Sequence, residues 1–293
     1  MATANILSRA VFAGEGRVGN QRGRCEVIQA VRDAYMANQR VRRLLQWAGH
    51  QPLVLRVRTR YLTPHDAFLA SYPRSGSTWM RFLLYESLTG QSADFDAVNT
   101  YKGRNARQVL PGGGRVVGTH DRYSHGDRKA VYLVRDPRSV VISEYKLERR
   151  QGSERSFDDF FRAFLEGKTN PFGSWADHIQ FWMTSVPARR GHLHLVKFEE
   201  LRSRPEETLA GVTDFLGVPL DRATVEAVVG NNTVERMRAK EDVAPRETFT
   251  RARSREIRFV NEGATQGWQE QLSSAQAALL LERTQASREL LGY

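Results

Sequence analysis

Short apolar runs alternate along this chain with longer segments whose apolar positions recur at helical spacing. Four runs have the length of buried strands, and they cover residues 67–71, 115–119, 131–134 and 193–198. Helical patterns follow them, which is the order expected when strands pair in parallel and helices cover the sheet. The pattern therefore predicts an α/β fold in a single domain, with a mainly parallel central sheet flanked by helices.

The predicted helices are marked by residues that start and stop helices. Residues 78–89 place apolar side chains on one face and end at Gly90, and residues 139–149 follow Asp136 and Pro137. Asp136 is expected to cap the second of these helices. Four further helices are predicted to begin after Ser156, at Ser174, at Pro205 and at Ser273 or Ser274.

The N-terminal region differs from the rest in composition. Residues 1–24 are rich in Gly and Arg and lack periodicity, so we expect a flexible basic arm. The domain itself is expected to span residues 25–293 and to open with an amphipathic helix over residues 25–48. The net charge is +11, and the first 60 residues hold eleven Arg against three acidic residues. Such a surface attracts anions, including nucleotides and sulfated glycans, unless it is only a solvated arm.

The cysteine content and the hydropathy of the sequence bear on where the protein is located and on whether it binds a metal. Cys25 is the only cysteine, so neither an internal disulfide nor a cysteine-rich metal site can form. The sequence has no apolar stretch of about 18 residues that would predict a membrane span, and it shows no pattern of a secretory signal. We therefore expect a cytoplasmic protein without a bound metal.

One strand, turn and helix form a candidate site for an anion. The run at 67–71 leads into the turn Pro-Arg-Ser-Gly-Ser-Thr, and the helix at 78–89 follows at once. Backbone N–H groups of such a turn converge, and the helix N-terminus adds partial positive charge. Gly76 lets an anion approach the backbone closely. The alternative is a Ser- and Gly-rich turn that joins strand to helix without a ligand.

This turn differs from the phosphate-binding loop of nucleoside triphosphatases. The motif G-x-x-x-x-G-K-[ST] is absent, so the Lys and the Mg²⁺-binding hydroxyl of that motif are missing. The side-chain donors that this turn offers are Arg74, Ser75, Ser77 and Thr78.

A second strand, turn and helix covers residues 132–146. Arg135 ends the strand, and Ser143 lies about two turns into the helix. By itself, an Arg at a strand end is more often part of a surface ion pair. A planar guanidinium also binds phosphate oxygens in pairs, which makes Arg135 a candidate second anchor for an anion.

His120 is the candidate general base among the seven His of the chain. It follows the strand at 115–119, so it is predicted to lie at the carboxyl edge of a parallel sheet, where ligands bind in open α/β folds. Histidine accepts protons near neutral pH. The competitors have structural interpretations: His178 lies in an aromatic helix, and His192 and His194 lie on a strand.

The segment from Tyr72 to Trp79, YPRSGSTW, resembles the 5′-phosphosulfate loop of the sulfotransferase family, usually Y-P-K-S-G-T-T-W. The resemblance implies a P-loop-like fold and a donor, 3′-phosphoadenosine 5′-phosphosulfate (PAPS), whose adenine contacts Trp79. Arg74 replaces the usual Lys, as it does in many bacterial members. The loop residues that the resemblance assigns to phosphosulfate binding are Arg74, Ser75, Gly76, Ser77 and Thr78.

Two further segments keep the order of the family. Arg135 and Ser143 match the segment whose Arg and Ser hold the 3′-phosphate of the donor. Thr119-His120 matches part of the family's K-T-H motif, which implies that His120 is the base. The resemblance also implies direct in-line transfer of the sulfuryl group to a hydroxyl, assisted by Arg74, with release of 3′-phosphoadenosine 5′-phosphate (PAP) and without a metal.

The C-terminal third resembles the family with substitutions. Phe198 replaces the Tyr of a Tyr-Glu-Asp step that closes over adenine, and Thr233 matches the Ser of an adenine-flanking S-F-x-x-M segment. Residues 261–268 keep Gly263 of the R-K-G-x-x-G-D-W clamp on the 3′-phosphate, but Asn and Glu replace its basic pair. We expect Arg258, just upstream, to compensate for that loss of charge.

These motifs do not identify the molecule that accepts the sulfuryl group. We expect a hydroxyl of a small-molecule or glycosylated acceptor, with residues 90–115 and 240–258 forming the walls of its pocket. The Arg content of the second segment favours an anionic or glycosylated acceptor, unless those Arg serve the donor. No nucleic-acid partner is expected, and a homodimer is left open. One alternative function is a nucleotide- or glycan-binding protein that lacks a competent base. Another is a small-molecule kinase with a degenerate loop.

Overall fold

A computed structural model describes most of the chain beyond its N-terminal region. The chain divides into two units, Met1–Val54 and Leu55–Tyr293. The predicted basic arm at 1–24, the predicted helix at 25–48 and Gly263 lie outside the described residues. The residues that the structure describes are 60–101, 106–122, 126–244, 258, 260 and 267–293.

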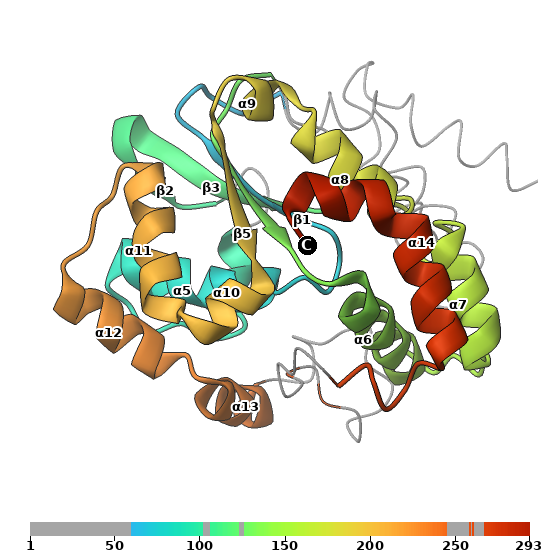
Figure 1. The fold of residues 1–293 in the computed structure, drawn as a ribbon. Coiled ribbons are helices and arrows are strands. Elements are labelled where there is room, and N and C mark those ends of the chain that lie inside the picture. Colours follow the sequence, from blue (N-terminus) through green and yellow to red (C-terminus); the bar gives the residue numbers. More distant parts are fainter. Residues whose placement is uncertain (1–59, 102–105, 123–125, 245–257, 259, 261–266) are drawn as a thin grey trace, which may run out of the picture. The chain divides into compact units, whose positions relative to one another are not determined.

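A mixed sheet lies at the centre of the second unit (Figure 1). In the described residues its strands pair in the order β2-β3-β1-β4-β5. Strands β3, β1, β4 and β5 are parallel to one another, and β2 is antiparallel to β3. The predicted α/β fold with a mainly parallel sheet is confirmed. The bounds are β1 (Ala67–Ser71), β2 (Gln108–Leu110), β3 (Gly114–Thr119), β4 (Ala130–Val134) and β5 (Leu193–Lys197).

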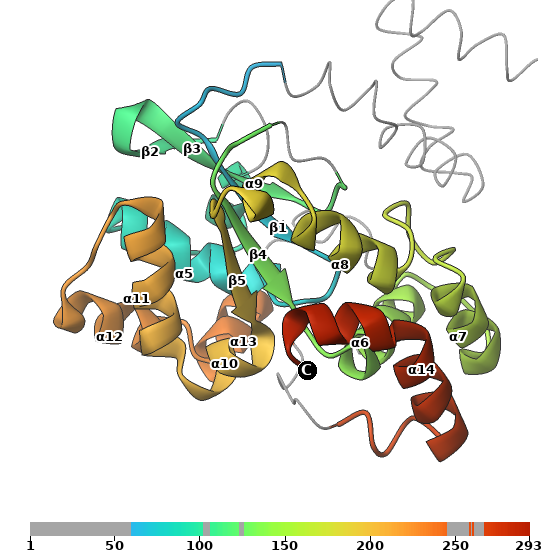
Figure 2. The same ribbon diagram turned by 45° about the horizontal axis from the view of Figure 1, so that its top comes forward.

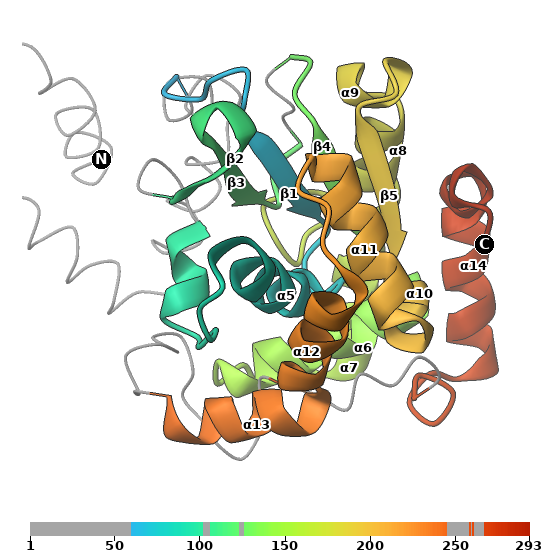
Figure 3. The same cartoon turned by 90° about the vertical axis from the view of Figure 1, so that its left-hand side faces the viewer.

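Helices cover both faces of this sheet, and the central strand β1 separates two apolar cores. Ala67 and Leu69 belong to one core, and Phe68 and Ala70 belong to the other. The first core is shared with α5 (Ser77–Thr89), α11 (Pro205–Leu216), α12 (Arg222–Asn231) and α13 (Val234–Val243). The second core is shared with α6 (Pro137–Arg150), α7 (Phe157–Leu165), α8 (Trp175–Met183) and α14 (Ser274–Leu291). This alternation is the two-residue period of a strand that is buried on both faces. Figure 3 shows α5, α11 and α12 in front of the sheet, and Figure 2 shows α14, which contacts α8 and α6.

The helices begin largely where local sequence predicts. The Asp136 side chain accepts a hydrogen bond from the backbone N–H of Arg138 at 2.8 Å, and Ser273 forms a capping box with Gln276. The main helices have these bounds: α5 (Ser77–Thr89), α6 (Pro137–Arg150), α7 (Phe157–Leu165), α8 (Trp175–Met183), α11 (Pro205–Leu216) and α14 (Ser274–Leu291). The remaining α-helices, which were not predicted, are α9 (Val186–Arg189), α10 (Phe198–Ser203), α12 (Arg222–Asn231) and α13 (Val234–Val243).

One boundary differs from the prediction in a way that affects the site. Phe198 was expected to end a strand, but β5 ends at Lys197 and Phe198 begins α10. Glu199 and Glu200 occupy the first turn of α10, where carboxylates interact favourably with the helix dipole. None of the helices in the described ranges is both long and apolar enough to cross a membrane.

The parallel register brings several predicted site residues to one edge of the sheet. Ala70 of β1 pairs with Thr119 of β3, and Ser71 pairs with Leu133 of β4. The carboxyl ends of the three strands therefore meet at this edge. The chain leaves it through the loop at 72–76 after β1, through His120 after β3 and through Arg135 after β4.

Candidate active site

The loop between β1 and α5 has the backbone of an anion-binding turn. Arg74 has φ 67° and Gly76 has φ 97°, so both lie in the left-handed region. Gly76 is the N-cap of α5 and provides no side-chain cap, and the first turn of the helix contains no acidic residue. The amide groups of that turn are thus left for another acceptor.

A buried hydroxyl in the same loop also lacks a partner. Ser75 is 0% exposed, and among the described residues its Oγ makes no hydrogen bond. An unsatisfied buried hydroxyl costs free energy unless a ligand or water completes it. Arg74, Ser75, Gly76 and the start of α5 therefore offer hydrogen-bond donors and positive charge where the sequence predicts an anion site, and the binding of an anion there stays a prediction.

The structure brings the two predicted anion anchors into direct contact. Arg74 donates from Nε to Ser143 Oγ at 3.0 Å, and Arg135 donates from Nη1 to the carbonyl oxygen of Arg74 at 3.4 Å. Burial lowers the pKa of Arg74 to about 10, and the nearby charge of Arg135 contributes in the same direction. Arg74 therefore remains protonated at neutral pH, and the two guanidinium groups concentrate positive charge at this edge of the sheet.

Phe198 lies against both anchors. A Cβ built on Gly76 would approach Phe198 Cδ2 to 2.6 Å, so the glycine is required by this contact as well as by its φ. The guanidinium carbon of Arg135 lies 4.2 Å from the Phe198 ring centroid, and Trp79 meets the same ring edge to face at 6.2 Å. The aromatic ring fixes these side chains even without the hydroxyl of the usual Tyr.

His120 follows β3 and is held by the end of β1. Its Nδ1 lies 2.7 Å from the carbonyl oxygen of Ser71 and 3.2 Å from the hydroxyl of the same residue, and the nearer oxygen, a carbonyl, can only accept a hydrogen bond. Nδ1 must therefore carry a proton, and in the neutral ring the lone pair lies on Nε2. The predicted base thus has a tautomer with an unprotonated ring nitrogen. Its competitor His178 is 0% exposed and packs against Tyr72 and Tyr132 of the core, as expected.

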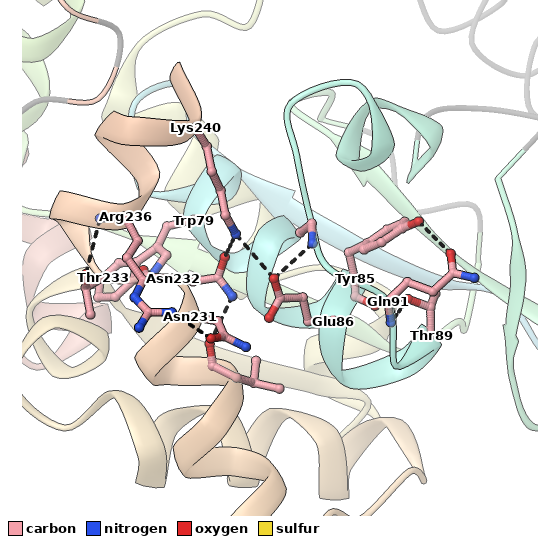
Figure 4. A network of polar contacts seen from close by, with 12 residues as sticks. Trp79, Tyr85, Glu86, Thr89, Gln91, Asn231, Asn232, Thr233, Arg236 and Lys240 are labelled. Atoms are coloured by element: carbon pink, nitrogen blue, oxygen red, sulfur yellow. Dashed lines mark hydrogen bonds and ion pairs between the residues drawn. The ribbon is translucent and has the colours of Figure 1, made fainter. Parts of the chain in front are cut away.

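Trp79, which is predicted to contact adenine, belongs to a polar network that sequence reasoning missed (Figure 4). Trp79 donates from Nε1 to the carbonyl oxygen of Asn232 at 2.9 Å. Lys240 Nζ lies 3.0 Å from Asn232 Oδ1 and 3.3 Å from Glu86 Oε1. Thr233 caps α13 by accepting from the backbone N–H of Arg236 at 3.3 Å. Buried Glu86, which interrupts the apolar face of α5, was the local signal for this network.

A second buried acid, Glu144, lies behind the loop and was also missed. Its Oε1 accepts a hydrogen bond from Asn170 Nδ2 at 2.8 Å, and the same amide donates to the hydroxyl of Tyr72 at 2.8 Å. Glu144 is 6% exposed, and burial raises its pKa to about 7. This carboxyl therefore changes charge near neutral pH.

Of the two predicted donor-binding residues near the C-terminus, the structure describes Arg258 but not Gly263. Arg258 forms an ion pair with Asp242 at 3.2 Å, and both side chains are about half exposed. A carboxylate thus already neutralises the charge that was expected to replace the missing basic pair, and the role of Arg258 stays a prediction.

Metal binding has no support in the described part of the chain. No group of three or more His, Cys, Asp or Glu residues there is placed to hold a metal ion.

Known proteins were compared with this chain by sequence and by fold. Sulfotransferase 4A1 of Mus musculus is 29% identical over 189 residues, which cover 57% of this chain and 64% of that protein. Human sulfotransferase 2B1 is 26% identical over 62% of this chain and 54% of its own length. The chain thus spans less than two thirds of the length of these relatives.

Solved structures support the fold. Retinol dehydratase in complex with androsterone and PAP has a TM-score of 0.62 at 17% identity, covering 80% of this chain and 83% of that one. Mouse SULT7A1 complexed with PAP has a TM-score of 0.57 at 18% identity, covering 78% and 85%.

The family model for the sulfotransferase domain matches residues 115–291, which include His120, Arg135 and Ser143. The loop at 72–76 precedes that match, and its position at the end of β1 comes from the fold. Because the match covers more than half of the chain, the protein belongs to the sulfotransferase family.

Proposed function

We propose that this protein transfers a sulfuryl group from PAPS to a hydroxyl of a small-molecule or glycosylated acceptor and releases PAP. The observation that carries the proposal is the contact between the two anion anchors. Arg74 meets Ser143 and Arg135, although these partners lie 69 and 61 residues away in the sequence. A donor with phosphate groups at both ends of one nucleoside matches two linked cationic anchors.

Different residues of the site are suited to different groups of the donor. The Ser75 hydroxyl and the amides that begin α5 are suited to the phosphosulfate, because they are donors that lack an acceptor within the described fold. Arg135 and Ser143 are suited to the 3′-phosphate. Trp79, with its indole N–H already bonded to Asn232, offers the faces of its ring to adenine.

The reaction needs one proton acceptor. The acceptor oxygen bonds to sulfur while the bond from sulfur to the phosphate oxygen of the donor breaks. His120 takes the hydroxyl proton at Nε2, since Nδ1 is already protonated against Ser71. Arg74 remains charged and stabilises the negative charge that develops on the departing phosphate.

The direct test is transfer of label from ³⁵S-labelled PAPS to a panel of phenols, glycolipids and natural-product scaffolds. We expect a labelled product with at least one class of acceptor. His120→Ala should lose transfer while it retains PAP binding by isothermal titration calorimetry. If the wild-type protein does not bind PAP, or if His120→Ala transfers the label as well as the wild type does, the proposal is contradicted.

The same experiments separate the alternatives. A nucleotide-binding protein without turnover would bind PAP but yield no labelled product with any acceptor. A small-molecule kinase would consume ATP in the presence of Mg²⁺, and the missing Lys of the triphosphatase loop argues against that outcome. A cytoplasmic location remains part of the proposal, on the ground that the single Cys25 cannot form an internal disulfide.

A further inference from the structure

A second histidine lies directly behind the proposed base. His178 of α8 is 0% exposed, and its Nε2 lies 3.1 Å from the carbonyl oxygen of His120. Its Nδ1 lies 2.8 Å from the hydroxyl of Tyr132 on β4. Both ring nitrogens are thus engaged inside the core, one by the residue that follows β3 and the other by a residue of β4.

These two contacts fix the tautomer of His178. The carbonyl oxygen of His120 can only accept, so Nε2 of His178 carries the proton and donates. Nδ1 is then the acceptor, and the Tyr132 hydroxyl donates to it. Burial lowers the pKa of His178 to about 3, so the ring stays neutral over the range in which most proteins are active.

The same ring also contacts the donor loop. Tyr72, the first loop residue after β1, meets the His178 ring edge to face at 5.5 Å. The Tyr132 ring stacks with the same ring, with centroids 5.7 Å apart. His178 therefore touches the segment that precedes Arg74 and the backbone of His120 at once.

We propose that His178 is a positioning residue that holds the main chain of His120 so that the hydrogen bond from Nδ1 to Ser71 persists and Nε2 remains the proton acceptor. This inference rests on the proposed function of His120. Proton transfer passes only to His120, since His178 contacts a backbone carbonyl and not the reacting ring. If His178 only stabilised the core, its replacement would change the stability of the protein and leave kcat unchanged. If His178 positions His120, its replacement lowers kcat.

The first measurement needs no acceptor and no variant. Nitrogen-15 chemical shifts of the wild-type protein report the tautomer of each histidine ring. We expect His120 protonated at Nδ1 and His178 protonated at Nε2, with His178 neutral down to about pH 5. A proton on Nε2 of neutral His120, or on Nδ1 of His178, would overturn the inference even in a protein that shows no transferase activity.

The second measurement compares two substitutions of His178. Phe removes both hydrogen bonds and keeps a flat ring, whereas Gln can still donate to the His120 carbonyl and accept from Tyr132. We expect His178→Phe to lower kcat on the order of ten- to a hundredfold, as for a small misplacement of a catalytic group, with little change in the Kd for PAP. His178→Gln should recover most of that loss. His192→Gln, at an exposed ring whose Nδ1 lies 2.8 Å from Asp127 Oδ1, is the control and should match the wild type.

The kcat values of the two variants distinguish a positioning role of His178 from a structural one. A kcat for His178→Phe within twofold of the wild type refutes the positioning role, and so does an equal loss in the Phe and Gln variants. If His178→Phe does not fold, the tautomers of the wild type and the kcat of His178→Gln still decide the question. Absence of transfer by the wild type would contradict the proposed function instead, and would leave the tautomer measurement to decide this inference.

Discussion

Replacing Glu144 by Gln should raise the stability of the protein above neutral pH. Glu144 lies in α6 behind the donor loop and is 6% exposed. Its Oε1 accepts from Asn170, while its buried Oε2 has no hydrogen-bond partner among the described residues. Glutamine keeps the volume and the acceptor for Asn170, and it removes the charge.

The magnitude follows from the shift in the pKa of Glu144. Burial raises the pKa from 4.5 to about 7, and this outweighs the opposing effects of Asn170, Thr169 and Arg74. At about 1.4 kcal/mol per pKa unit, that difference corresponds to about 3 kcal/mol of unfolding free energy. Between these two values the folded protein keeps a proton that the unfolded chain releases. Stability that is present below pH 4.5 is therefore lost as the pH rises to about 7.

The assay is urea-induced unfolding of the wild type and Glu144→Gln at several pH values between 5 and 8. We expect the two proteins to have similar unfolding free energies near pH 5, and the variant to be more stable by up to about 3 kcal/mol at pH 8. Glu282→Gln, on the exposed side of α14, controls for the loss of a carboxyl. A difference between the wild type and Glu144→Gln that does not change with pH would refute this reasoning.

Three further predictions concern the donor side of the site. Gly76→Ala should weaken PAP binding at least tenfold by calorimetry, because its Cβ would clash with the aromatic ring over the loop and its φ is 97°; unchanged affinity would contradict the requirement for glycine. Lys240→Met should lower the unfolding free energy by about 3 kcal/mol, because it leaves buried Glu86 without its cation, and a loss below about 1 kcal/mol in urea unfolding would show that the pair contributes little. Arg258→Ala should raise the Kd for PAP more than Arg251→Ala does, and equal dissociation constants would exclude Arg258 from the 3′-phosphate site.

Features that depend on neighbouring residues could be predicted from the sequence. Asp136 and Ser273 cap helices because a side chain reaches an amide two or three residues further along. The strand β2 could not be predicted, because only one of its three residues is buried and it has no periodic pattern. Phe198 was placed in a strand because it ends the apolar run at 193–198, but the acidic residues after it favour the start of a helix.

One contact within the site was implied by the family resemblance, whereas others could not be predicted from the sequence at all. The closeness of Arg74 and Ser143 was implied only by the family resemblance, since 69 residues separate them. Glu144 carried no local signal of its surroundings, because it is one of many polar residues in α6. The aromatic helix around His178 indicated that it packs in the core, but not which groups its ring nitrogens contact. Their partners come from other elements, and only the folded chain brings them together.

The alternation along β1 has a consequence for how this sequence can change length during evolution. Each residue of β1 belongs to one of two cores in turn, and the donor loop begins immediately after Ser71. Inserting one residue into β1 would exchange its core side chains and displace the loop by about 3.3 Å. We therefore expect homologues to keep the interval from Ala67 to Ser77 free of insertions and deletions, and to vary in length between Thr89 and Gln108.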